Sequence, residues 1–135
     1  MDLHRKLLPY MEEELAREGV ERPPKFVFVK SIVIGPWRVP GLADMVRGEI
    51  YISAEEVDEM LEAGFPESFV RRHMAVVILH ELKHYKDMVR MSPEGLREHL
   101  RRYAEDPEYH ERFEDEATDF AIELTTRIRR ELGEL

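Results

Sequence analysis

The stretch VVILHELKHY, residues 76–85, places two histidines four positions apart inside the most apolar segment of the chain. Apolar residues recur with helical spacing on both sides of it, which predicts a core helix over residues 65–91. Residues four apart lie on one face of a helix. His80, Glu81 and His84 would therefore lie together in the core, where unpaired polar groups are costly. A bound metal ion would offset that cost.

Two imidazoles on such a helix can bind one tetrahedral ion at about 2.0–2.1 Å. A helix advances by about 100° per residue, so Glu81 flanks the face that carries His80 and His84. There it can hold a water molecule at the metal and accept its proton. The chain has no cysteine, which leaves His and carboxylate as its only strong metal ligands. The competing interpretation is a chance grouping, since the chain contains 6 His and many Glu.

A third protein ligand is required, and the last predicted helix, residues 108–132, offers several carboxylates. The apolar residues of this helix form one stripe: Phe113, Ala117, Phe120, Ala121, Leu124 and Ile128. Glu114 borders the stripe, whereas Glu116 lies about 100° from its centre and Asp119 lies on the far side. Glu114 is the best third ligand on this geometry, and Glu116 is the weaker alternative. Thr118 can donate a hydrogen bond to a ligand.

The remaining patterns predict both helices and strands. Ser53 and Glu56 have the spacing of a capping box at the start of a helix. The order of helix, strands and helices predicts one α+β domain over residues 1–135. The further predicted elements are a helix over 2–18, a strand over 25–35, a short strand near 43–46, a strand over 48–53, and helices over 54–64 and 94–106.

Composition narrows the classes of partner and compartment. The net charge of -9 disfavours binding to nucleic acid, because phosphate neutralisation needs a basic surface. No run of 18 apolar residues is present, so no membrane span is expected. The N-terminal sequence lacks the pattern of a signal peptide, and we expect a cytoplasmic protein. Abundant Glu and Arg with no Asn or Gln are typical of heat-adapted surfaces, so a thermophilic source is expected.

A His-Glu-x-x-His helix, followed by a helix with Glu-x-Glu-Ala-x-x-Phe-Ala at residues 114–121, resembles the gluzincin metallopeptidases. The chain is most similar to the small archaeal minigluzincins and to the catalytic cores of membrane CaaX-type peptidases. The resemblance implies a zincin-like α+β fold. Its expected parts are an N-terminal backing helix, a small and mainly antiparallel sheet of about three strands, an active-site helix and a C-terminal glutamate helix.

The same resemblance implies one Zn²⁺ bound by His80, His84 and Glu114, with Glu81 as the general base. It extends from about residue 41, where GLADMVRGEIYIS looks like the strand at the upper rim of the family's cleft. The chain departs from the family at Thr118, where Asp or Asn is usual.

These features predict a zinc-dependent peptidase that hydrolyses a peptide or protein substrate lying extended along the rim strand. Tyr103, His99, Tyr109 and His110 lie between the two metal-bearing helices in the sequence. Tyr109 or His110 is the favoured donor to the oxyanion that peptide hydrolysis develops.

Two alternatives concern activity. The acidic C-terminal segment after residue 128 could cover the cleft, which would make the chain a latent zymogen. The second alternative is a non-catalytic metal-binding module, or a regulatory interaction module built on a protease-like fold. A structural zinc site would be closed by four protein ligands, whereas a catalytic site keeps one position open.

Overall fold

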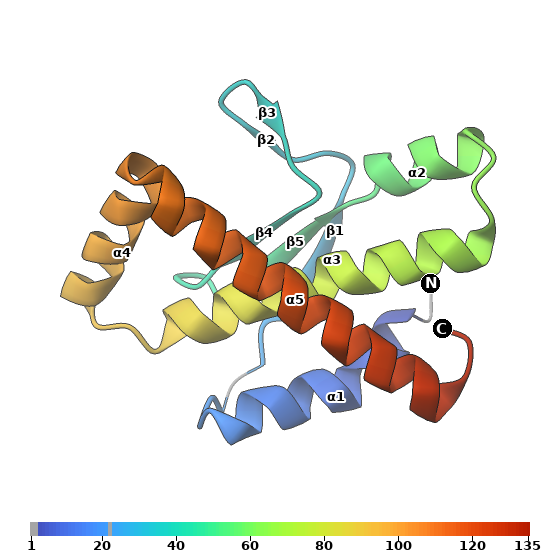
Figure 1. Ribbon diagram of the computed structural model, residues 1–135, viewed down its shortest axis with the longest axis horizontal. Helices are drawn as coiled ribbons and strands as arrows, with labels where there is room; N and C mark the ends of the chain where they lie inside the picture. The colour runs from blue at the N-terminus through green and yellow to red at the C-terminus, as the bar shows by residue number, and fades with distance from the viewer. Residues whose placement is uncertain (1–2, 22) are drawn as a thin grey trace.

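The structure of the chain, a computed structural model, describes residues 3–21 and 23–135 (Figure 1). The predicted α+β class is confirmed, and residue 2 of the predicted first helix lies outside the described residues. The elements are α1 (Leu3–Arg17), β1 (Lys25–Val29), β2 (Val33–Ile34), β3 (Trp37–Arg38), β4 (Gly41–Asp44), β5 (Glu49–Ser53), α2 (Glu55–Glu62), α3 (Glu67–Val89), α4 (Pro93–Glu105) and α5 (Pro107–Leu132).

The three-stranded sheet has the order β1–β5–β4. β5 runs parallel to β1 and antiparallel to β4, so the sheet is mixed rather than mainly antiparallel as expected. β5 takes the central position because its alternate residues Ile50 and Ile52 are fully buried. Residues 30–40 cross the end of β5 and form a separate antiparallel hairpin, β2–β3, so the strand predicted over 25–35 is divided in two. β4 is left at the edge of the sheet.

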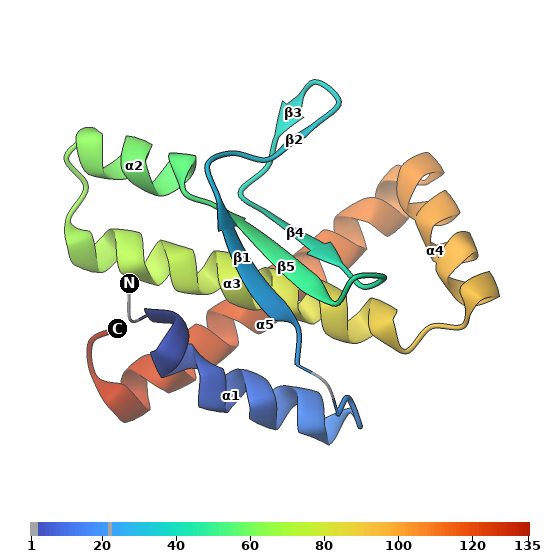
Figure 2. The same cartoon turned by 180° about the vertical axis from the view of Figure 1, so that it is seen from behind.

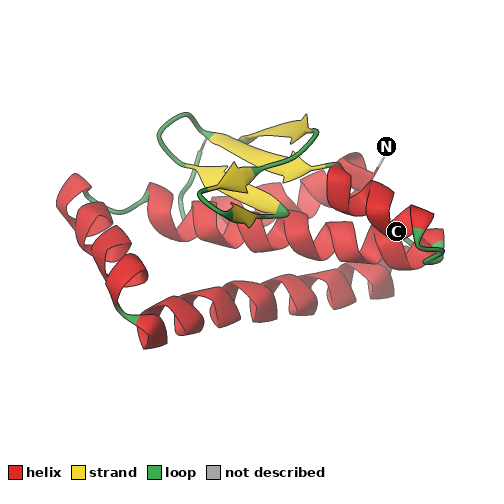
Figure 3. Cartoon of the chain, turned by 90° about the horizontal axis from the view of Figure 1, so that it is seen from above, coloured by secondary structure: helices red, strands yellow, loops and turns green. Residues whose placement is uncertain are grey.

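Helix α3 occupies the middle of the molecule, with the sheet on one side and α5 on the other (Figures 2 and 3). It contacts α1, α2, α5, β4 and β5. A helix surrounded in this way must be apolar on most of its faces, which explains the length of its apolar segment. Its most completely buried residues are Ala75, Ile78, Leu79 and Leu82. They join α1, β5 and α5 in one hydrophobic cluster.

Side-chain caps begin two of the helices. Ser92 accepts a hydrogen bond from the Gly95 amide at 3.0 Å, and Asp106 accepts from the first amides of α5. The capping box predicted at Ser53 and Glu56 is wrong. Ser53 is the last residue of β5 and pairs with β1, so Ala54 becomes the N-cap without a side-chain bond.

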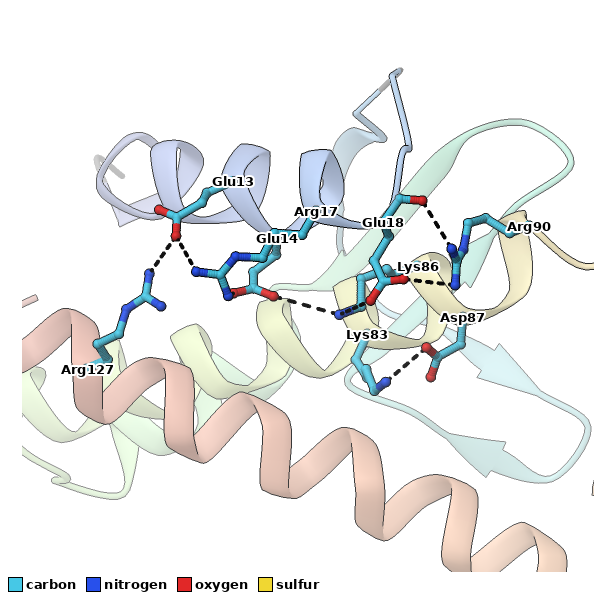
Figure 4. A network of polar contacts seen from close by, with 9 residues as sticks. All are labelled: Glu13, Glu14, Arg17, Glu18, Lys83, Lys86, Asp87, Arg90 and Arg127. Carbon is cyan, nitrogen blue, oxygen red and sulfur yellow. Dashed lines mark hydrogen bonds and ion pairs between the residues drawn. The ribbon is translucent and has the colours of Figure 1, made fainter.

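A network of ion pairs joins α1 to α3 (Figure 4). Lys86 lies 3.7 Å from both Glu14 and Glu18, and Arg90 pairs with Glu18 at 2.9 Å. Arg17 pairs with Glu14 at 3.0 Å. Each of these acidic groups therefore faces a basic one at the contact between α1 and α3.

The C-terminal segment packs beside the first turns of α3, whereas the latency hypothesis places it over the cleft. Leu135 is buried, and its main-chain oxygen accepts a hydrogen bond from Arg71 in the first turns of α3. His80 lies nine residues further along α3, which is about 13 Å along the axis. The apolar side chain of Leu135 joins the hydrophobic cluster, so this segment does not fold over the histidines.

Within residues 3–21 and 23–135, none of the helices combines the length and the apolarity that crossing a bilayer would require.

Candidate metal centre

Helices α3 and α5 bring three potential ligands together. His80 and His84 project from α3, and Glu114 projects from α5. Nε2 of His80 lies 2.8 Å from Oε2 of Glu114 and 2.9 Å from Nε2 of His84. Nε2 of His84 lies 3.2 Å from the same carboxylate oxygen. Two nitrogens and one oxygen therefore point at a common position.

The donor set fits a divalent cation. In a tetrahedral site with bonds of about 2.0–2.1 Å, neighbouring ligand atoms lie about 3.3 Å apart, close to the observed triangle. Hydrogen bonds alone cannot satisfy this arrangement, because the two Nε2 atoms that face each other can share only one proton. Nδ1 of His84 is buried and has no hydrogen-bond partner among the described residues. A cation would accept lone pairs from all three atoms.

Electrostatics keep the carboxyl group of Glu114 ionised. Burial raises its pKa, but the hydrogen bonds from His80, His84 and Tyr103 outweigh burial and hold the pKa of Glu114 far below its usual range. Burial lowers the pKa of His80, while the hydrogen bond with Glu114 and the charges of Glu81 and Glu114 reverse that effect, so its net shift is upward. Glu114 is therefore ionised where its carboxylate faces the two imidazoles.

Neighbouring side chains fix both imidazole rings. Oγ1 of Thr118 lies 3.2 Å from Nδ1 of His80. Thr118 therefore forms a hydrogen bond to a candidate ligand, as the sequence suggested. The ring of His84 stacks on Phe113, with 4.7 Å between centroids and 18° between planes. Phe113 precedes Glu114 on α5, and the same turn of helix therefore supplies one ligand and supports another.

Glu81 lies against the sheet beside the histidines. Its side chain is buried beneath β4, and the Ala43 amide donates a hydrogen bond to its carboxylate. Burial raises the pKa of Glu81. A Cβ atom on Gly41 would lie only 2.7 Å from Cγ of Glu81, so β4 can approach this closely because residue 41 is glycine. The ligand atom of Glu81 lies within 4.8 Å of the ligand atoms of His80 and His84.

A cleft of about 780 Å³ opens above these groups, between β4, the β2–β3 hairpin and α4. Apolar side chains dominate its lining, and among the described residues that line it none is Lys or Arg. Ile34, Trp37, Leu42 and Leu100 lie at its exposed rim, and Trp37 is 71% exposed. Edge strand β4 forms one wall. The cleft therefore gives access to His80, His84 and Glu114 from one side.

The other predicted site residues are Tyr109, His110 and Glu116. The Tyr109 hydroxyl bonds Nδ1 of His99 at 2.6 Å, and Tyr109 is not among the lining residues of the cleft. His110 does line the cleft, and its Nδ1 donates to the main-chain oxygen of Tyr103 at 3.3 Å. Glu116, the alternative ligand, is exposed to solvent.

Two contacts at the centre were not predicted. The Tyr103 hydroxyl donates a hydrogen bond to Oε1 of Glu114, and Gly41 packs against Glu81. The turn at Pro107 offered a signal for the first, since helices joined by a short turn face each other and bring Tyr103 toward α5. No local sequence pattern predicted the contact of Gly41 with Glu81, because this contact depends on how the sheet packs against α3.

Comparison with known proteins yields no relative for this chain: no family model, no curated protein and no solved structure matches it.

Proposed function

We propose that the protein is a zinc-dependent peptidase. One observation carries the proposal: Nε2 of His80, Nε2 of His84 and Oε2 of Glu114 lie within 3.2 Å of one another below an open cleft. The mixed nitrogen and oxygen donors are those of catalytic zinc sites with three protein ligands. When bound there, Zn²⁺ supplies Lewis acidity toward a carbonyl oxygen and toward water.

Glu81 is the proposed general base. It projects from α3, its carboxylate neighbours both histidines, and the Ala43 amide of β4 donates a hydrogen bond to it. Burial moves its pKa upward, toward the range in which a carboxylate exchanges protons efficiently near neutral pH. Glu81 would accept a proton from the attacking water and then deliver it to the amine that leaves.

The cleft supports a peptide as the substrate. β4 is an edge strand, and an extended chain can add to such an edge through main-chain hydrogen bonds. Gly41, Leu42 and Ala43 lie along the cleft, so a peptide bound there would pass beside Glu81. The apolar lining favours a segment with uncharged side chains.

The test combines metal analysis with peptide cleavage. Purified protein should bind one Zn²⁺ per chain and cleave a library of unstructured apolar peptides, and His80→Ala should lose both properties. Glu81→Gln should keep the metal while its kcat/KM falls by about 10²- to 10⁴-fold, because the base is lost and the ligands are not.

The outcomes separate the alternatives. Absence of bound metal from the wild-type protein would refute the proposal at its root. Stoichiometric zinc with no cleavage of any peptide would instead favour the non-catalytic metal-binding module.

A further inference from the structure

The two oxygens of the Glu114 carboxylate have different partners. Oε2 faces Nε2 of both His80 and His84, at 2.8 Å and 3.2 Å. Oε1 accepts a hydrogen bond from the hydroxyl group of Tyr103. Tyr103 belongs to α4, so this contact brings a third helix into a centre whose other groups come from α3 and α5.

A carboxylate without such a donor has two equivalent ways to present itself to a cation. It can bind through one oxygen or through both, and it can rotate between them. A phenol that donates to one oxygen removes this freedom, because it occupies that oxygen and fixes the plane of the carboxylate. In this protein the donor leaves Oε2, and only Oε2, directed at the histidines.

Tyr103 is itself held in place. Its ring lies 4.1 Å from the ring of His110 and 5.8 Å from that of Phe113, measured between centroids. Its main-chain oxygen accepts the hydrogen bond from His110. The side chain is only half-buried, yet these ring contacts restrict its rotation. The hydroxyl group is therefore held toward Glu114 at the corner where α4 ends and α5 begins.

We propose that Tyr103 is a positioning residue, which holds Glu114 as a single-oxygen ligand and so sets the affinity and the coordination number of the metal site. The role assigned to Tyr103 rests on the metal site proposed above. It does not require that the protein be a peptidase, because it concerns metal binding alone.

The test compares two tyrosines that lie in the same corner. Tyr103→Phe keeps the ring and removes the donor to Glu114. Tyr109→Phe is the matched control, because its hydroxyl group bonds His99 and not a ligand. Zn²⁺ affinity is measured by competition with a chromophoric chelator. We expect Tyr103→Phe to raise the Kd by about 10- to 100-fold, as partners of metal ligands commonly do, and Tyr109→Phe to change it by less than about threefold.

Cobalt substitution supplies a readout that a loss of folding stability would not produce. With Oε1 released, Glu114 can bind through both oxygens, and the visible absorption of the Co²⁺ form should weaken as its coordination number rises. A double variant adds a second check. In a Glu114→Ala background, Tyr103→Phe should change the Kd by less than about twofold, because contacting residues that act through one another are not additive.

The results decide between two failures. If the wild-type protein binds no metal, the proposed function and the role of Tyr103 fall together. If it binds one ion and Tyr103→Phe binds as tightly, with an unchanged Co²⁺ spectrum, only the role of Tyr103 is refuted. An equal loss in Tyr109→Phe would refute it as well, because the effect would then belong to the corner as a whole.

Discussion

Helix α3 carries polar groups on two faces, and the two sets differ in how their charges are matched. On the face that meets α1, Lys86 lies between Glu14 and Glu18, and Arg90 completes the network (Figure 4). On the face that meets β4 and α5, two imidazoles and two carboxylates meet without any Lys or Arg among the described residues of the cleft.

The difference separates a structural cluster from a candidate functional one. Burial of charge is tolerated where each group finds an opposite partner, as in the network around Lys86. Among the described residues that line the cleft, the cluster around His80 has no Lys or Arg, and its lone pairs converge on one point. This contrast between the two faces of α3 supports the proposal of a cation site beside His80 and His84.

The largest expected effect tests the ligand set itself. Glu114→Ala should weaken Zn²⁺ binding by at least about a hundredfold, because one of three protein ligands contributes several kcal/mol to a binding free energy of about 10–16 kcal/mol. Glu116→Ala is the control, since Glu116 is exposed two residues away. Isothermal titration with Zn²⁺ gives both values. Equal losses of Zn²⁺ affinity in the two variants would contradict the assignment of Glu114, rather than Glu116, as the ligand from α5.

The second effect concerns the wall of the site. Gly41→Ala would place a Cβ atom 2.7 Å from Cγ of Glu81, so the carboxylate or β4 must move. We expect kcat/KM to fall by about 10- to 100-fold with metal content unchanged, because small displacements of a catalytic group are this costly. Combined with Glu81→Gln, Gly41→Ala should add little. Full additivity would show that Gly41 acts elsewhere than through Glu81.

The third effect addresses the balanced face. Lys86→Met should lower the free energy of unfolding by about 1–3 kcal/mol, because Glu14 and Glu18 lose a buried partner but each keeps an arginine. Lys83→Met is the control, since the ion pair of Lys83 with Asp87 is partly exposed and lies within α3. Urea unfolding measures both. The affinity for Zn²⁺ should stay within about twofold of the wild-type value. A large loss of this affinity in Lys86→Met would show that the network around Lys86 and the group around His80 are coupled.

The smallest effect concerns the rim of the cleft. Trp37→Ala should raise the KM for apolar peptides by about three- to tenfold, since a bound peptide would cover part of this exposed ring. Val33→Ala is the matched control, because Val33 is exposed on the same hairpin but does not line the cleft. Steady-state kinetics compare the two. A larger change in Val33→Ala would place the peptide outside the cleft.

Much of the candidate site follows from local periodicity. The spacing of His80 and His84 places both on one face of any helix that contains them, and the apolar residues around them require that helix to be buried. Likewise, the stripe from Phe113 to Ile128 sets the rotation of α5, which leaves Glu114 at the boundary of the core and Glu116 in solvent. These are properties of single helices, and a sequence encodes them directly.

Contacts between elements depended on the tertiary structure. The parallel pairing of β1 with β5 arises because residues 30–40 cross the end of β5, which no local pattern marks. The hydrogen bond from Tyr103 to Glu114, the approach of Gly41 to Glu81 and the burial of Leu135 each join segments that pack only in the complete fold. Sequence alone therefore determined which faces are polar and apolar. The packing of helices and sheet decided which atoms meet, because that packing minimises exposed apolar surface over the whole chain at once.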